Sequence, residues 1–424
     1  MRGCRRSSEI ERVTDCLVVG AGIIGIACGL ELLKRGKSVL ILDENPPGSM
    51  TSAGNAGGLG ITEVMPIASP GVSRRVPAWL FDPYGPLAIK WRHLPSMIPW
   101  LWSFQRQSSF ANMTANAEAL RELLSICMGD TRELLTQTGL THALTENGAL
   151  TVFPSAASFD NNQLEWRIKQ EYGVEAIRVD KLAVHDLEPN LRNVHSGWFT
   201  PAWCNVEDPL ALATSLADVF LSSGGSIRRE KVVKFKRDEN QVHSLLTGNG
   251  TEYQARQYIV AAGIWSKSLC RELGEKVIIE SERGYNTTLP DPGLEIGREI
   301  IFGEEKLVAS TIGSKLRIGG AAEFAAIDSP PNYKRSDRLL SIAHRYLPEI
   351  NSDGRENWMG QRPSTPDSLP VICASSKANN VLYAFGHGHL GLTMAATTAR
   401  LIGNLSDTEI PSIDLRPCHI DRFN

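Results

Sequence analysis

The stretch from residue 15 to residue 43 constrains the fold of this chain more than any other part of its sequence. It starts with an apolar run, Cys16–Val19, continues through three glycines at positions 20, 22 and 25, and then carries the apolar periodicity of a helix as far as Gly36. A second apolar run, residues 38–42, ends at Asp43. This order predicts a buried strand, a tight turn, a helix and a second parallel strand, which together begin a doubly wound α/β domain.

The three glycines of this turn have separate physical roles. Gly20 permits the tight turn, and Gly22 lets the backbone approach a pyrophosphate. Gly25 allows the helix to pack closely on the sheet, and the N-terminus of that helix directs free N–H groups toward the phosphates. Asp43, at the end of the second strand, can accept hydrogen bonds from an unphosphorylated ribose. The pattern therefore predicts FAD or NAD in preference to NADP, and its complete context favours a dinucleotide site over a purely structural turn.

The overall composition excludes several classes of protein. With 424 residues the chain is long enough for two domains, which can be interleaved. The 44 Lys and Arg residues nearly balance the 47 Asp and Glu residues, and their scattered positions predict no nucleic-acid surface. The arginines near the N-terminus precede a polar, acidic run, so we predict no secretory signal. The first apolar run is too short and too rich in glycine to span a membrane, and we therefore expect a cytoplasmic protein.

The cysteines and histidines do not form a metal-binding pattern. The eight cysteines show no C-x-x-C pair and no recurring spacing. Cys16 and Cys28 lie in apolar runs, which predicts free thiols in a reducing compartment. His387 and His389 lie two residues apart in a glycine-rich loop without nearby acidic or thiol ligands, so we expect no metal site.

A second cluster of small and hydroxyl-bearing residues, Met50–Gly58, follows the second strand closely. Residues this small cannot build a core, but they can bring the backbone against a flat or charged ligand. A flexible linker is the alternative interpretation. The short distance from the phosphate turn favours a site for a long cofactor.

From this cluster onward the sequence resembles the FAD-dependent D-amino-acid dehydrogenases, within the larger set that includes glycine oxidase, sarcosine oxidase and D-amino-acid oxidase. The resemblance rests on the phosphate turn, on Thr51–Ser52 and Asn55–Gly57, and on motifs nearer the carboxyl end. It covers nearly the whole chain and is weakest from residue 76 to residue 200. It implies that the small-residue cluster runs beside the pyrophosphate, the ribityl chain and the isoalloxazine of FAD.

Three residues are the catalytic candidates, and the resemblance implies the roles of two of them, Arg362 and Tyr285, because many relatives have other residues at the position of His389. Arg362, in a Gly-x-Arg-Pro segment, matches an arginine whose guanidinium forms a fork onto the substrate carboxylate, and only a planar guanidinium offers two parallel donors. Tyr285, in a strand predicted at residues 280–289, matches a phenol that approaches the same carboxylate. His389 lies in the glycine loop before a helix at residues 394–405, whose N-terminus faces the flavin pyrimidine and stabilises negative charge there.

The cofactor site predicted from these motifs draws on several segments, one of them the strand at residues 258–260, which passes under the FAD. The segment after Arg362 has no cysteine of the kind to which monomeric sarcosine oxidases attach their flavin, so we expect noncovalent FAD. The predicted cofactor-binding residues are Gly20, Gly22, Ile23, Ile24, Gly25, Asp43, Glu44, Thr51, Ser52, Asn55, Ala56, Gly57, Val233, Ala262, Gly263, Trp265, Gly388, His389, Leu390, Gly391, Leu392 and Thr393.

A stretch rich in tryptophan and proline, residues 76–107, holds four of the nine tryptophans. It either packs its aromatic side chains onto the second domain or forms an interfacial patch for a membrane or a quinone-carrying partner. Its prolines are expected to break any long amphipathic helix, which favours the packing interpretation. The alternative prediction is a peripheral contact with the inner face of the membrane through this stretch.

The remaining periodicities complete the predicted architecture. We expect a doubly wound, Rossmann-like FAD domain interleaved with an α+β substrate domain on an antiparallel sheet, and a substrate site between them under the flavin. The FAD domain takes residues 12–75, 204–268 and 355–424, and the substrate domain takes residues 76–203 and 269–354. Helices are expected at residues 111–138, 155–172 and 208–221, and strands at residues 149–153, 231–235, 242–246, 299–302, 306–310 and 315–319.

These features together predict an FAD enzyme that oxidises a D-amino acid, or a cyclic D-imino acid such as D-proline or D-hydroxyproline. The expected step is hydride transfer from Cα to flavin N5, which gives an imine that water can hydrolyse to a 2-oxo acid. No strong side-chain base is apparent, and none is required if the amine enters neutral. A glycine or N-methylglycine oxidase and a noncatalytic flavin subunit are the alternatives. The sequence leaves open the exact substrate, the oligomeric state and the electron acceptor, either oxygen or a quinone chain.

Overall fold

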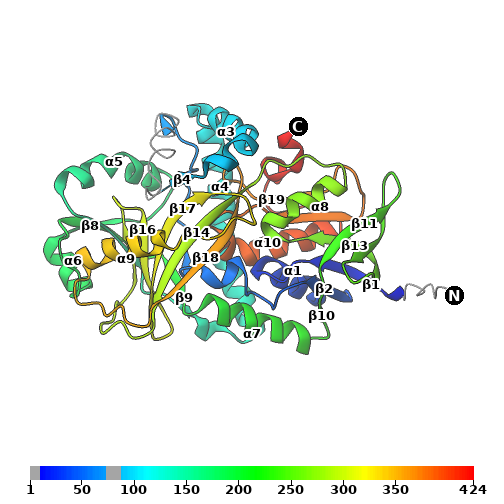
Figure 1. Ribbon diagram of the computed structural model, residues 1–424, viewed down its shortest axis with the longest axis horizontal. Helices are drawn as coiled ribbons and strands as arrows, with labels where there is room; N and C mark the ends of the chain where they lie inside the picture. The colour runs from blue at the N-terminus through cyan, green and yellow to red at the C-terminus, as the bar shows by residue number, and fades with distance from the viewer. Residues whose placement is uncertain (1–9, 73–86) are drawn as a thin grey trace.

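Two large β-sheets, each with helices packed on it, form two lobes that lie side by side (Figure 1). The computed structural model describes residues 10–72 and 87–424. The α-helices are α1 (Ile23–Lys34), α3 (Leu94–Gln107), α4 (Phe110–Thr138), α5 (Ala156–Glu171), α6 (Lys181–Leu187), α7 (Pro209–Ser222), α8 (Ser266–Glu272), α9 (Lys334–Tyr346) and α10 (Gly391–Ser406). The strands are β1 (Ile10–Val19), β2 (Val39–Asp43), β3 (Gly58–Leu59), β4 (Leu87–Ile89), β5 (Leu144–Thr145), β6 (Ala149–Phe153), β7 (Ile177–Asp180), β8 (Ser196–Thr200), β9 (Cys204–Val206), β10 (Ser226–Arg229), β11 (Val232–Arg237), β12 (Val242–Thr247), β13 (Glu252–Val260), β14 (Glu280–Leu289), β15 (Glu299–Phe302), β16 (Leu307–Ile312), β17 (Lys315–Phe324), β18 (Glu356–Ser364), β19 (Val371–Ala374) and β20 (Val381–Phe385).

The first sheet is built around the glycine turn that follows β1. Its strands run in parallel in the order β10-β2-β1-β13-β20, with β1 hydrogen-bonded to β2 on one side and to β13 on the other. β19 pairs antiparallel with β20, and β12 and β11 extend β13 in the antiparallel sense. This order confirms the predicted doubly wound domain. It also brings the carboxyl ends of β1, β2 and β13 to one edge, which is where such domains bind nucleotides.

Alternate residues of the central strand β1 are buried on opposite faces of the first sheet. Cys16 and Val18 belong to the core that α1, α7 and α10 cover, whereas Leu17 and Val19 belong to the core that α8 covers. Because both faces are buried, the strand is continuously apolar instead of alternating between apolar and polar residues. This double burial explains the unbroken apolar run that precedes the glycine turn in the sequence.

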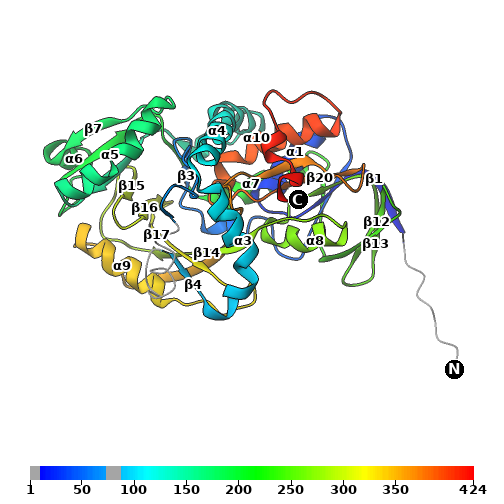
Figure 2. The same cartoon turned by 90° about the horizontal axis from the view of Figure 1, so that it is seen from above.

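The second sheet is mainly antiparallel, in the order β18-β14-β17-β16-β15-β6-β8-β7, with β4 beside β17. Helix α9 packs on its outer face, away from the first lobe (Figure 2), and contributes Leu339, Leu340 and Tyr346 to a core shared with the strand residues Ile300 and Ile318. The opposite face of the sheet is therefore left to line the space between the lobes. The predicted antiparallel sheet is confirmed, and a small third sheet, β3-β9-β5, accompanies it.

Strand β18 lies in the second sheet, although the sequence analysis assigned residues 355–424 to the cofactor domain. All nine of its residues pair with β14, from Glu356 opposite Thr288 to Ser364 opposite Glu280. As an edge strand it tolerates Pro363, which has no N–H to donate to a neighbouring strand. The chain therefore returns to the first sheet only at β19, and the Gly-x-Arg-Pro segment approaches the site from the second sheet.

The described part of the tryptophan-rich stretch forms β4 and helix α3, whereas its first residues, up to position 86, lie outside the described part of the chain. The expectation that prolines prevent a helix here is wrong for residues 94–107. Pro95 lies in the first turn, where an N–H donor has no partner in the helix anyway. Pro99, inside the helix, cannot donate the hydrogen bond to the carbonyl of Pro95, yet the helix continues past it to Gln107.

Helix α3 packs one of its faces on the rest of the protein and exposes the other. Trp100 stacks on Phe104, with ring centroids 4.8 Å apart, and both rings pack in one core with Phe324 of the second sheet. On the opposite side of the helix, Ile98 and Trp102 are 60% and 62% exposed. The packing interpretation therefore holds for one face of α3, and the other face stays open to solvent. None of the described helices is long and apolar enough to cross a membrane.

The first prediction concerns the contact between α1 and β1. A Cβ atom on Gly25 would overlap the carbonyl oxygen of Gly20, so Gly25→Ala should push the helix off the sheet and destabilise the fold by about 1–3 kcal/mol. Thermal unfolding should show a lowered melting temperature. Gly129→Ala in α4 is the matched control, because its new methyl group would meet no atom within 4 Å and alanine is the better helix former. A Gly25→Ala variant as stable as Gly129→Ala would contradict this account.

Candidate active site

A cavity of about 1760 Å³ lies between the two lobes and takes its walls from both sheets. Pockets for a single drug-sized ligand measure roughly 300–1,000 Å³, so this cavity has room for a long cofactor and a second, smaller molecule. Most of the predicted site residues line it, namely Gly20, Gly22, Ile23, Ile24, Asp43, Glu44, Thr51, Ser52, Asn55, Ala56, Ala262, Gly263, Trp265, Tyr285, Arg362, Gly388, His389, Leu390, Gly391, Leu392 and Thr393.

The three glycines of the turn differ in whether the packing of the protein requires them, and this difference indicates where a phosphate group binds. Gly20 has a φ of +111°, and a Cβ there would lie 2.5 Å from the carbonyl oxygen of Ala261, so the fold itself requires glycine. Gly25 is required by the packing of α1 on β1. At Gly22, by contrast, a Cβ would make only an ordinary contact of 3.5 Å with the Ser52 hydroxyl. Because protein packing does not demand a glycine at this position, its open side is available for a ligand to approach the backbone.

The acid at the end of β2 is held in place by the same turn. Asp43 accepts hydrogen bonds from the N–H of Ala21, at 2.7 Å, and from the N–H of Asn45, at 2.8 Å. These bonds fix the carboxylate at the edge of the cavity, where a ribose is expected. The neighbouring Glu44 forms an ion pair with Lys231, at 3.0 Å. The arrangement fits an adenosine dinucleotide with an unphosphorylated ribose.

The small-residue cluster is an ordered wall of the cavity and not a flexible linker. It includes a short 3₁₀ helix, Thr51–Gly54, that is tied to the second sheet by side-chain hydrogen bonds. Thr51 donates to the carbonyl of Gln361, at 2.9 Å, and Asn286 donates to the carbonyl of Gly54, at 3.0 Å. Arg317 donates to the carbonyls of Ala53 and Asn55, at 2.9 and 2.6 Å. The linker interpretation is therefore wrong.

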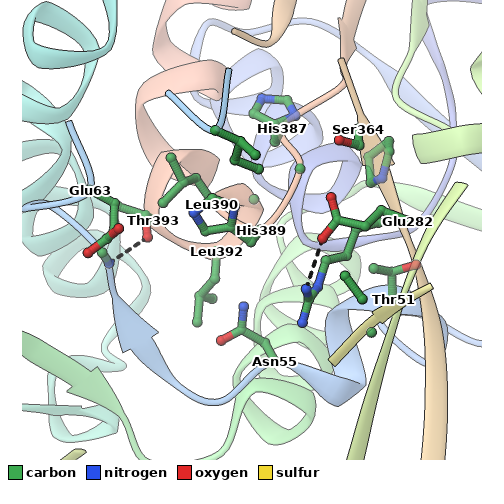
Figure 3. Close-up of a pocket in the computed structure, with 18 of the residues that line it drawn as sticks. Thr51, Asn55, Glu63, Glu282, Ser364, His387, His389, Leu390, Leu392 and Thr393 are labelled. Carbon is green, nitrogen blue, oxygen red and sulfur yellow. Dashed lines mark hydrogen bonds and ion pairs between the residues drawn. The ribbon is translucent and has the colours of Figure 1, made fainter. Parts of the chain in front are cut away.

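The glycine loop before α10 brings two histidines to different environments. His387 is buried behind the loop, where Nε2 lies 2.9 Å from the hydroxyl of Thr398 and burial lowers its pKa to about 3. His389 lies nearer the centre of the cavity, between Glu63 and Glu282 (Figure 3). Burial lowers the pKa of His389 as well, against the opposing effect of these two carboxylates. No group of three or more His, Cys, Asp or Glu residues suited to a metal occurs in the described part of the chain.

Arg362 is held in position by an acid and a glycine of β14. Its Nη1 donates to Glu282 Oε1, at 3.2 Å, and the plane of the guanidinium lies so close to Gly284 that a Cβ there would be 2.6 Å from Nη2. The arginine side chain keeps 30% of its surface accessible within the cavity, whereas that of Glu282 keeps 9%. The pair therefore presents a cation and an anion side by side to the cavity, with further N–H donors of the guanidinium available to a ligand.

Tyr285 directs its hydroxyl to two hydrogen-bond partners within the protein. Its hydroxyl donates to Glu323 Oε2, at 2.7 Å, and accepts from the N–H of Asn332, at 3.1 Å. Burial and the Glu323 carboxylate raise the pKa of the phenol to about 12. The side chain belongs to the core under α9, on the outer face of the sheet, because neighbouring residues of a strand point to opposite faces. The hydroxyl is therefore engaged away from Arg362, and its contact with a substrate carboxylate stays a prediction.

Three predicted cofactor residues lie behind the cavity wall. Gly25 is covered by the turn that precedes it, and a Cβ on Gly57 would lie 2.5 Å from the carbonyl oxygen of Val206 in β9. Val233 is 44% exposed, and its neighbour Val232 lines the cavity instead. The last difference is a shift of one residue along β11, which moves a side chain from one face of the strand to the other.

A charged group that the sequence did not predict lies at the far end of the cavity. Lys169, on α5, has only 4% of its side chain accessible and forms ion pairs with Glu63, at 3.1 Å, and with Glu165, at 3.3 Å. Glu299, on β15, accepts a hydrogen bond from Nε1 of Trp203, at 3.3 Å, and burial raises its pKa to about 8. The spacing of these residues gives no local signal, because the cavity assembles them from separate segments.

The fold and this cavity define a dinucleotide-binding protein with a second ligand site between its lobes. A family model described as FAD dependent oxidoreductase matches residues 15–405, and the chain belongs to this family. The predicted resemblance and the FAD cofactor are thereby confirmed, and the protein is an FAD-dependent oxidoreductase. The residues around the phosphate turn fit this cofactor, as the open side of Gly22 shows.

Individual relatives match over almost their whole length. The chain is 34% identical to a D-amino-acid oxidase of Bradyrhizobium diazoefficiens over 414 residues, which cover 96% of this chain and 98% of the relative. It is 31% identical to a D-amino acid dehydrogenase of Paramagnetospirillum magneticum over 421 residues, again 96% and 98%. Among solved structures, glycine oxidase from Geobacillus kaustophilus matches with a TM-score of 0.72 and 22% identity, over 96% of this chain and 98% of that one. This likeness supports the fold.

The second prediction tests the placement of the phosphates. Gly22→Val should abolish FAD loading, because a branched side chain would occupy the space next to the backbone that the pyrophosphate needs. The flavin content of the purified protein measures the effect, and circular dichroism should show a folded apoprotein. Gly129→Ala should load FAD normally. Full FAD occupancy in Gly22→Val would show that the phosphates bind elsewhere.

The third prediction separates the two roles considered for Tyr285. Tyr285→Phe leaves the N–H of Asn332 without its acceptor, which should cost about 1–3 kcal/mol of stability. The melting temperature should therefore fall while kcat/KM stays near the wild-type value. A large loss of kcat/KM at an unchanged melting temperature would restore the hydroxyl to the substrate site.

Proposed function

We propose that this FAD-dependent enzyme oxidises a D-amino acid, or a cyclic D-imino acid such as D-proline or D-hydroxyproline, at the Cα–N bond. The observation that carries the proposal is the Arg362–Glu282 pair, which presents both charges to the cavity that contains the phosphate turn. An α-amino acid carries a carboxylate and an amine on the same carbon, and this pair offers a partner for each. The names of the two curated relatives support the D configuration.

Arg362 would bind the substrate carboxylate through its remaining N–H donors. Two parallel N–H···O bonds fix the plane of a carboxylate, so the fork orients Cα as well as supplying charge. Glu282 would accept a hydrogen bond from the amine and so set the rotation about the Cα–carboxylate bond. Because this carboxylate lies next to the amine, it is also a candidate acceptor for the proton that the nitrogen loses, a group that the sequence analysis did not find.

The opposite wall of the cavity supplies the electrostatic environment of the cofactor. When bound, FAD supplies the acceptor for the hydride that leaves Cα, and the substrate becomes an imine that water hydrolyses to a 2-oxo acid. The N-terminus of α10 would face the flavin pyrimidine and stabilise negative charge there. His389, whose pKa is lowered by burial, would act as a neutral imidazole beside the substrate. We propose noncovalent FAD.

Two alternatives make different predictions. A glycine or N-methylglycine oxidase would use the same pair but would prefer the smallest substrates, which leave part of the space beside the cofactor unfilled. A noncatalytic flavin subunit would need no substrate anchor, and the presence of Arg362 beside Glu282 argues against it. The exposed face of α3, with Ile98 and Trp102, supports the prediction of a contact with a membrane or a quinone-carrying partner. The electron acceptor would then be a quinone, and oxygen is the alternative acceptor.

The proposed reaction is tested by mixing the oxidised enzyme anaerobically with a panel of D-amino acids, D-proline, glycine, sarcosine and the L-enantiomers. We expect D-amino or D-imino acids to bleach the flavin absorbance, and admission of oxygen or a soluble quinone then identifies the acceptor. Bleaching by L-enantiomers alone, or by none of these compounds, would refute the proposal. Bleaching by glycine or sarcosine in preference to all D-amino acids would favour the first alternative.

The fourth prediction concerns the carboxylate anchor. Removal of one partner from a buried, charge-assisted pair costs about 2–5 kcal/mol, so Arg362→Ala should lose on the order of 30-fold or more in kcat/KM. Arg362→Lys keeps the charge but not the fork, and should lower both kcat and the affinity for substrate. Both variants should retain the spectrum of bound FAD. Arg355→Ala, at an exposed ion pair with Asp337, is the matched control and should turn over normally. Near-normal turnover by Arg362→Ala would place the anchor elsewhere.

A further inference from the structure

Glu299 is a buried carboxyl group that the proposed chemistry does not use. It lies on β15, is 5% exposed, and lines the same cavity as Arg362. Its carboxylate lies directly against the backbone of Gly58, where any side chain would overlap it. The local structure thus keeps a glycine opposite this carboxylate and gives it space at the cavity wall.

The hydrogen-bond partners of Glu299 are incomplete. Trp203 Nε1 donates to Oε2, at 3.3 Å, and Oε1 has no hydrogen-bond or ion-pair partner within residues 10–72 and 87–424. Burial of a carboxylate with a single neutral donor is costly, and burial together with the nearby Glu63 raises the pKa of this group to about 8. An isolated carboxyl of this kind is stabilised by a ligand that brings a positive charge to it.

The surrounding charges leave this end of the cavity with an excess of acid. Lys169, which is buried, and Arg317, which is partly buried, line the same cavity, and both already have partners. Lys169 is shared between Glu63 and Glu165, and Arg317 donates to the carbonyls of Ala53 and Asn55. Lys306 acts on Glu63 from an exposed position, where solvent screens its charge. The Glu165 side chain is 39% exposed, so solvent screens its charge. Glu63 and Glu299 then face one buried ammonium group, and one further positive charge would balance these two carboxylates.

The floor of the cavity connects this end with the carboxylate anchor. Between β14, which carries Glu282, and β15, which carries Glu299, lie only β17 and β16. Neighbouring strands are about 4.8 Å apart, so three such steps separate the two acids by roughly 14 Å along the sheet. Most of the intervening wall carries small or short side chains, Gly319, Gly320, Ala322 and Val308, and the longer Leu307 and Arg317 lie on the same two strands. A small amino acid held by Arg362 would leave the Glu299 end unfilled.

We propose that the Glu299 end of the cavity binds the positively charged end of a substrate side chain, so that basic D-amino acids are preferred over neutral ones of the same length. This inference rests on the proposed function and adds the class of substrate to it. An acidic substrate side chain would meet the carboxyl groups of Glu63 and Glu299 there and is expected to be the poorest.

The matched substrates for the test are D-lysine and D-norleucine, which have the same carbon chain and differ in the terminal amine. Wild-type enzyme should show a higher kcat/KM for D-lysine, mainly through a lower KM. Glu299→Gln keeps the shape of the side chain but removes its charge, and it should reduce the ratio of the two kcat/KM values by about 30-fold, the usual effect of breaking a buried charge pair. Turnover of D-norleucine should change little.

The control variant is Glu295→Gln, four residues before Glu299 and exposed to solvent away from the cavity, which should leave the ratio unchanged. Equal kcat/KM values for the two substrates in the wild type, or an unchanged ratio in Glu299→Gln, would overturn the inference while the proposed function stands. Failure of every D-amino acid to reduce the flavin would instead overturn the proposed function. The wild-type comparison alone decides the matter if Glu299→Gln does not fold.

Discussion

The whole arrangement depends on how closely helix α1 approaches strand β1. That approach is possible only because neither Gly20 nor Gly25 carries a side chain, and it places the first turn of α1 beside the ends of β1 and β2. The positive end of the α1 dipole and the N–H groups of its first turn then lie at the same edge of the sheet as the carboxylate of Asp43, which its hydrogen bonds hold in place. Every other part of the site is positioned relative to this edge.

The second lobe is joined to that edge by hydrogen bonds from side chains to the backbone of the small-residue cluster. Arg317 and Asn286, both on strands of the second sheet, hold the carbonyls of Ala53, Gly54 and Asn55. The segment expected beside the flavin is thus fixed by the sheet that carries the substrate anchor. These hydrogen bonds hold the two lobes at a fixed distance from each other. A site built from both lobes can therefore keep the accurate positioning that hydride transfer needs.

The sequence predicted those parts of the molecule that are determined by neighbouring residues. The phosphate turn and the parallel sheet follow from local patterns, in which a glycine has few alternatives, and the role of Arg362 is a prediction from the resemblance of its Gly-x-Arg-Pro segment. Tyr285 was expected at the substrate because of the resemblance, whereas its phenol lies on the outer face of β14, and a sequence does not show which face of a strand a side chain takes. Glu282, Glu299 and Lys169 were missed because their roles arise only when distant strands and α5 meet around one cavity.

The central claim is that one cavity holds FAD and an amino acid so that Arg362 binds the carboxylate beside Glu282. A crystal structure of the FAD-loaded protein with the 2-oxo acid product of its best substrate tests this most directly. We predict two N–H···O bonds of about 2.7–2.9 Å between the guanidinium of Arg362 and the ligand carboxylate, with the ligand Cα over the flavin. A carboxylate bound instead by Arg317 or Lys169, with Arg362 still paired to Glu282 alone, would contradict the account.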